Sequence, residues 1–120
     1  MGIFTTKGFF SVVEEENDPD QVLIRSRLKK DIQSLKRLFN ALGLKTEGII
    51  VNARSDYKYR FMADRMDWIL VMTRLMLDLN YRNFKDAVYK VDSREFRDNR
   101  HEAYFQVWTT MRKLQLLETI

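Results

Sequence analysis

Residues 8–43 have the sequence GFFSVVEEENDPDQVLIRSRLKKDIQSLKRLFNALG, in which a period of two gives way to a period of three to four. The side chains of residues 8–14 and 22–26 divide between two alternating faces, as they do in β-strands. Between them, residues 17–20 read Asn-Asp-Pro-Asp, whose side-chain acceptors and fixed proline φ favour a turn. The sequence therefore predicts a β-hairpin with its turn at residues 17–20.

An amphipathic helix is predicted directly after the hairpin. Apolar side chains recur there at spacings of three and four, and lysines and arginines lie elsewhere around the helix. The apolar positions are Leu28, Ile32, Leu35, Leu38, Phe39 and Leu42. Ser26 precedes this run as a predicted helix cap. Gly43 follows it and supplies the left-handed residue that ends many helices.

The same order of elements returns in residues 48–80. Residues 48–53 resemble a strand, residues 54–56 a turn, and residues 57–62 alternate with period two. The alternation predicts that the rings of residues 57, 59 and 61 face one way and that Lys58 and Arg60 face the other.

Three further helices are expected in the second half of the chain. The helix over residues 64–79 is apolar around most of its circumference, which predicts a central buried helix or one that also meets a partner. A short helix follows over residues 84–91, and a last one runs from Ser93 to about Leu117. The apolar stripe of the last helix is Tyr104, Phe105, Trp108, Met111 and Leu114.

These elements define an α+β fold. Two strand–strand–helix units predict a four-stranded, mainly antiparallel sheet with helices packed on one face, followed by two C-terminal helices. The other face of such a sheet tolerates solvent. We expect one domain over residues 1–120, in which residues 1–7 are a flexible lead-in.

Composition and charge narrow the class of protein. The chain is 45% hydrophobic and 32% charged, contains no cysteine and has no apolar run near the ~20 residues that a membrane span needs. It also begins without a secretory signal, so we expect a cytoplasmic protein without a membrane partner. Residues 1–20 hold one base and five acids, whereas residues 21–60 hold ten bases and three acids. Such a basic middle suits phosphates or an acidic protein, and the alternative is a solvated face that the acidic end partly neutralises.

The sequence predicts no catalytic, cofactor-binding or metal-binding residue. With His101 as the only histidine and no cysteine, nitrogen and sulfur sites for zinc or copper are disfavoured. The acids of residues 14–20 do not match a calcium-binding loop, and no nucleophile elbow or phosphate-cradling glycine pattern is present. A distant alternative is a metal-dependent nuclease, since Pro19-Asp20 and Asp56-Tyr57-Lys58 have the letters of its two half-sites.

Aromatic and basic residues interleave in residues 57–60 and 81–85. Rings beside arginine and lysine on a sheet would suit single-stranded nucleic acid. The period-two alternation instead favours rings packed under helices and cations in water. Both interpretations stay open.

Several short runs stand out along the chain: residues 9–13 (FFSVV), Arg25-Ser26-Arg27 before a helix with Asp31 and Leu35, residues 55–60 (SDYKYR), Asn83-Phe84-Lys85 and Val107-Trp108. Together they resemble a family of small bacterial and phage proteins of unknown function. The resemblance implies a prokaryotic or phage protein of the cytosol, and it carries over no catalytic residue.

The leading hypothesis is a non-enzymatic interaction protein, a phage or mobile-element product that binds and inhibits a host protein, for example one of its defences. The predicted partner-binding residues are Arg25, Arg27, Lys58 and Arg60 on the open sheet face, with Tyr81 and Arg82 in a loop. The alternative is nucleic-acid binding through the same cations. A homodimer through the helix over 64–79 or the final helix is left open.

Overall fold

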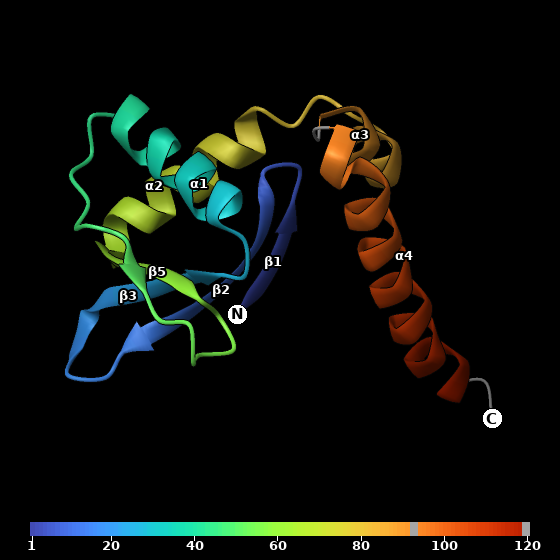
Figure 1. The fold of residues 1–120 in the computed structure, drawn as a ribbon, viewed down its shortest axis with the longest axis horizontal. Helices are drawn as coiled ribbons and strands as arrows, with labels where there is room; N and C mark the ends of the chain where they lie inside the picture. Colours follow the sequence, from blue (N-terminus) through green and yellow to red (C-terminus); the bar gives the residue numbers. More distant parts are fainter. Residues whose placement is uncertain (92–93, 119–120) are drawn as a thin grey trace. The chain divides into compact units, whose positions relative to one another are not determined.

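A five-stranded antiparallel sheet organises the first part of the chain in the computed structural model, which describes residues 1–91 and 94–118 (Figure 1). The strand order is β1-β2-β3-β5-β4. The strands are β1 (Gly2–Thr5), β2 (Gly8–Glu15), β3 (Asp18–Ser26), β4 (Ile50–Val51) and β5 (Tyr59–Asp64). The helices are α1 (Lys29–Ala41), α2 (Arg65–Leu77), α3 (Phe84–Val91) and α4 (Arg94–Leu117). The predicted α+β class is confirmed, with five strands rather than four.

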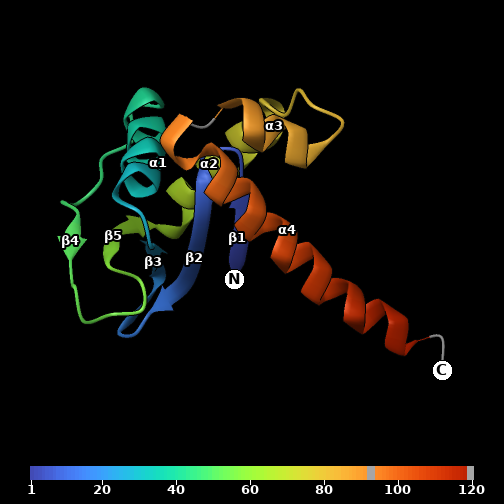
Figure 2. The same ribbon diagram turned by 45° about the vertical axis from the view of Figure 1, so that its right-hand side comes forward.

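The extra strand is β1, which the sequence predicted as a flexible lead-in. It pairs along β2 with Phe4 opposite Phe9, and the Val12 amide donates to the Met1 carbonyl oxygen at 2.7 Å. At the opposite edge, the strand expected over residues 48–53 is only the two residues of β4, beside β5 (Figure 2). Both differences concern edge strands, whose extent depends on the neighbouring strand more than on their own pattern.

The hairpin between β2 and β3 is tighter than predicted. Glu15 pairs with Asp18, so the turn is Glu16-Asn17, and the register shifts between Glu14 and Glu15 as in a β-bulge. Pro19 therefore lies inside β3 instead of in the turn. A proline is tolerated near the start of a strand, where its missing N–H removes no needed ladder bond.

The hydrophobic core lies on one face of the sheet. Val12, Ile24 and Phe61 stand opposite one another in register on β2, β3 and β5, and all three are buried. Helices α1 and α2 cover this face (Figure 1). Each such side chain stabilises the fold by about 1.5–3 kcal/mol through the apolar surface that it removes from water.

Helix α1 has the predicted buried stripe, with Ile32, Leu35 and Phe39 fully inaccessible. Its predicted end is also confirmed, because Gly43 adopts a φ of 74° just beyond the last turn. The predicted cap is wrong: Leu28 occupies the N-cap position, and the buried Ser26 hydroxyl donates instead to the Leu28 carbonyl oxygen at 2.7 Å.

Helix α2 is not the central buried helix that its apolar circumference predicted. Trp68 and Val71 are buried against the sheet and α1, whereas other large apolar side chains of α2 are exposed. The exposed ones are Met66, Ile69, Leu70, Met76 and Leu77. Within residues 1–79 the helix belongs to an outer layer, so the sheet covers only one of its sides.

Contacts divide the chain into two compact units, residues 1–79 and 80–120. In the second unit α3 packs on α4, with Val88 buried and the rings of Phe84 and Tyr104 stacked at 5.7 Å. Tyr104 is the only buried member of the predicted α4 stripe among the described residues, and Ser93 lies outside them. The single domain over residues 1–120 stays a prediction. No helix in the described part is long and apolar enough to cross a membrane.

Candidate anion-binding site

The loop before β5 places Tyr57 outside the strand. The Asn52 amide donates to the Lys58 carbonyl oxygen at 2.8 Å and closes the loop. Inside it, the Ser55 amide donates to the Asn52 carbonyl oxygen at 3.1 Å, and the Arg54 amide to the Asn52 side-chain oxygen at 3.1 Å. Asparagine and serine favour such turns because their side chains bond nearby backbone.

Three arginines surround Tyr57. The guanidinium carbons of Arg27 and Arg25 lie 4.3 and 4.9 Å from the centre of its ring, and Arg60 Nη2 donates to its carbonyl oxygen at 3.1 Å. The first two contacts are cation–π interactions, which stabilise an arginine on a tyrosine ring by about 0.5–2 kcal/mol. We call Arg25, Arg27, Tyr57 and Arg60 the Tyr57 cluster.

The cluster lies on the sheet face opposite the core. Ser11, Arg25 and Arg60 stand in register across β2, β3 and β5, one residue out of phase with the buried row of Val12, Ile24 and Phe61. Side chains that stand opposite one another share a face, so these three project together. Arg25 Nη2 donates to Ser11 Oγ at 2.7 Å, and Arg60 Nη2 donates to the hydroxyl of Ser55.

The arginines of this cluster, Arg25, Arg27 and Arg60, are not in ion pairs within the described residues. Arg25 and Arg60 are half-buried, and the Nε atom of each is fully covered without a hydrogen-bond acceptor. Like charges directly opposite each other in a ladder destabilise a sheet, and a covered donor without an acceptor adds to that cost.

An aromatic and apolar border lies beside the arginines. The ring of Phe9 lies 6.4 Å from that of Tyr57, and Phe4 lies 4.5 Å from Phe9. Phe4 is 39% exposed, and Ile50, opposite Arg60 in register, is also exposed. The site thus joins a charged centre to apolar surface.

The structure brings together three of the six predicted binding residues: Arg25, Arg27 and Arg60. The Lys58 ammonium lies instead over the ring of Tyr59 at 5.4 Å, and Tyr59 packs against the core. Tyr57 was predicted to face the core with Tyr59, which is wrong, because the loop interrupts the alternation before residue 59. The turn-forming residues 52–55 are the sequence signal that could have revealed it.

Tyr81 and Arg82 belong to the second unit. Arg82 is exposed, and the half-buried Tyr81 places its ring 5.8 Å from that of Phe84. His101 lies within α4, where its ring meets the edge of Tyr89 at 5.7 Å.

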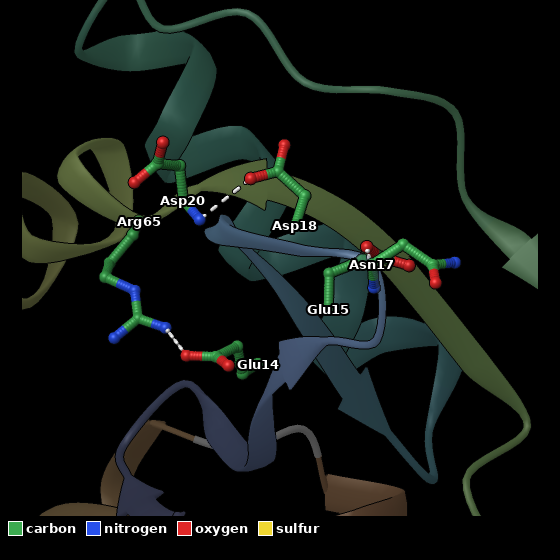
Figure 3. A network of polar contacts seen from close by, with 6 residues as sticks. All are labelled: Glu14, Glu15, Asn17, Asp18, Asp20 and Arg65. Carbon is green, nitrogen blue, oxygen red and sulfur yellow. Dashed lines mark hydrogen bonds and ion pairs between the residues drawn. The ribbon is translucent and has the colours of Figure 1, made fainter.

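The acids of the first twenty residues gather at the turn of the β2–β3 hairpin (Figure 3). Glu14 pairs with Arg65, Glu15 accepts from the Asn17 amide at 2.7 Å, and Asp18 accepts from the Asp20 amide at 2.9 Å. We call residues 14–20 the acidic hairpin. Within the described ranges no group of three or more carboxylate or histidine side chains is arranged to hold a metal ion.

The two nuclease-like half-sites do not meet. Asp20 lies next to Gln21, which pairs with Asp64 at the end of β5, whereas Asp56 precedes Tyr59 at its start. The length of β5 separates them, roughly 20 Å at the rise of a strand. One cation cannot be shared across that distance.

Comparison of the chain with protein families, with curated proteins and with solved structures finds no match. The geometry of the Tyr57 cluster is therefore the feature of the molecule that bears on function.

Proposed function

We propose that this chain is a non-enzymatic binding protein whose Tyr57 cluster engages an acidic surface of a partner protein. The observation that carries this proposal is the group of three guanidinium groups around one tyrosine, none of which takes part in an ion pair within the described residues. Arginine and tyrosine are also the residues that concentrate binding energy in protein interfaces.

The surroundings of the cluster favour a protein over a nucleic acid. Phe4, Phe9 and Ile50 add apolar surface on the same face of the sheet. An interface centre of this kind combines aromatic side chains with arginine. A base would need a free ring on which to stack, whereas guanidinium groups of the protein itself already occupy the ring of Tyr57.

The biological setting is a further part of the proposal. The resemblance to bacterial and phage proteins supports a host protein as the partner and its inhibition as the result. A compact chain that covers an acidic surface of a host protein would block that surface without catalysis.

The test is an affinity purification of the tagged protein from its native host, with and without nuclease, read by mass spectrometry. The baits are the natural chain, Arg25→Gln/Arg60→Gln and the charge-matched control Lys36→Gln/Arg37→Gln, which removes two charges from α1. We expect one protein to co-purify in stoichiometric amount with the natural chain and with the control bait, with or without nuclease. The same protein should not co-purify with the Arg25→Gln/Arg60→Gln variant.

Nucleic-acid binding is the second candidate, favoured by the ten bases of residues 21–60. In that case nuclease would release the co-purifying proteins, and affinity for nucleic acid would fall steeply with salt as counterions are released. Such a result would favour nucleic acid over a protein as the binding partner. Equal recovery on all three baits would remove the Tyr57 cluster from the binding site.

A further inference from the structure

Arg25 and Arg60 are hydrogen-bonded to neutral groups and take part in no ion pair within the described residues. They stand directly opposite each other on β3 and β5. Each guanidinium is anchored through Nη2 to a serine hydroxyl, Ser11 for Arg25 and Ser55 for Arg60. Arg60 gains a second anchor at the Tyr57 carbonyl oxygen, 3.1 Å away. Two like charges are thus oriented by neutral groups on one surface.

The remaining donors of both arginines have no acceptor within the described residues. Each Nε is covered and unbonded, and neither Nη1 takes part in a hydrogen bond there. A half-buried guanidinium has lost part of its hydration, which costs free energy. The second guanidinium opposite it carries the same charge and does not compensate for that cost. An anion between the two groups would supply acceptors and cancel the repulsion at the same time.

We propose that Arg25 and Arg60 form a clamp for a single oxyanion, and that the oxyanion is the carboxylate of an aspartate or glutamate side chain. The carboxylate source rests on the proposed function, in which the partner is an acidic protein. Arginine forks match the two oxygens of a carboxylate in one plane, and orientation by serine lowers the cost of binding. Arg27, stacked on Tyr57 and exposed, provides a neighbouring charge for a second acidic side chain.

The clamp predicts a specific gain in thermal stability for the isolated full-length protein. Unfolding is followed in a dilute buffer to which sodium glutarate, sodium phosphate or sodium chloride is added, with the three salts matched in ionic strength. A ligand that binds only the folded state raises its stability in a saturable way. With a dissociation constant on the order of 10 mM, 100 mM glutarate would raise the melting temperature by about 5 °C above chloride.

The Arg25→Gln/Arg60→Gln variant should lose this gain, and Lys36→Gln/Arg37→Gln should keep it. An equal response to all three salts, or an unchanged glutarate response in the cluster variant, would overturn the clamp. A response to phosphate but not to glutarate would overturn the carboxylate assignment.

A second readout does not depend on the fold of the variant. The Nε–Hε signals of Arg25 and Arg60 in ¹⁵N-labelled natural protein should move together as glutarate is added, while the exposed Arg37 signal stays in place. Stationary Arg25 and Arg60 signals would contradict the clamp. These measurements use no partner, so failure of the clamp and failure of the capture experiment are separate results.

Discussion

The acidic hairpin and the Tyr57 cluster lie at opposite ends of the β2–β3 ladder. They differ in the sign of their charge and in the partners that their charged side chains have. At the hairpin, Glu14 pairs with an exposed arginine, and Glu15 and Asp18 accept from nearby backbone amides. In the Tyr57 cluster, Arg25 and Arg60 are half-buried and donate hydrogen bonds only to neutral groups within the described residues. Three of the five acids in residues 14–20 thus have a local partner, whereas Arg25, Arg27 and Arg60 take part in no ion pair among the described residues.

This difference shows which charges are informative about function. Exposed charges in water cost little and arise without selection for binding, because solvent and salt screen them. A charge that is partly buried without a counter-charge lowers stability, and a protein keeps it at a cost that binding can offset. By this criterion the Tyr57 cluster is the site that we propose for binding, and the acidic hairpin is interpreted as a solvated turn.

Charge reversal gives the largest expected difference between the two ends. Arg25→Glu/Arg60→Glu should weaken binding of the captured partner at least about 30-fold, since losing a desolvated charge pair costs about 2–5 kcal/mol. The hairpin counterpart, Glu15→Lys/Asp18→Lys, should change affinity by less than about threefold, as rim charges do. Isothermal titration calorimetry measures both. Equal losses would mean that net charge, and not the cluster, determines binding.

The backbone at the start of β2 gives the next largest effect, on stability. Gly8 has a φ of 138°, and a Cβ there would lie 2.3 Å from the Asp31 carboxyl carbon. Gly8→Ala should lower the free energy of unfolding by about 2–4 kcal/mol, combining backbone strain with overpacking. Gly48→Ala is the control, because a Cβ at that position meets no atom within 4 Å. Urea denaturation that gives the two variants equal stability would contradict this account.

The ring of Tyr57 should contribute less than the charges that it supports. Tyr57→Leu removes the surface on which Arg25 and Arg27 rest, and should weaken partner binding about tenfold, in line with the strength of cation–π contacts. Tyr57→Phe keeps the ring and should bind like the natural protein. Calorimetry on both variants makes the comparison, and a loss in Tyr57→Phe as large as in Tyr57→Leu would assign the effect to the hydroxyl.

The smallest effect is expected at the ion pair of the acidic hairpin. The side chains of Arg65 and Glu14 are 45% and 58% exposed, so solvent screens their attraction. Glu14→Gln should change the free energy of unfolding by less than about 0.5 kcal/mol. Chemical denaturation measures it, and a loss above about 1 kcal/mol would show that the hairpin charges are not simply solvated.

Local periodicity was enough to predict the centre of the fold. The β2–β3 hairpin and α1 follow from residues 8–43, because their buried positions repeat with the period of their own element. The edge strands β1 and β4 and the exposure of α2 could not be predicted in this way. An edge strand forms where a neighbour offers unpaired backbone, and a helix that is apolar all round does not reveal which side the sheet covers.

The site was predictable only in part. Alternation along β3 and β5 placed Arg25 and Arg60 on the open face correctly, since successive side chains of a strand point to opposite faces of the sheet. The same alternation gave the wrong face for Tyr57. Residues 52–58 form a hydrogen-bonded loop, and the regular alternation of side chains begins only at Tyr59, where β5 starts. The role of Lys58 in binding stays a prediction, since its ammonium lies over the ring of Tyr59 and not in the Tyr57 cluster.

The most direct test is a backbone amide chemical-shift map of the natural protein during titration with an octaglutamate peptide. The account predicts shifts at Phe9, Ser11, Arg25, Tyr57 and Arg60, and none across the acidic hairpin. A parallel titration with an eight-nucleotide oligothymidylate should produce weaker shifts at the same residues. An octaglutamate map that is flat, or that spreads evenly over all surface lysines and arginines, would contradict the claim that the Tyr57 cluster is the binding site.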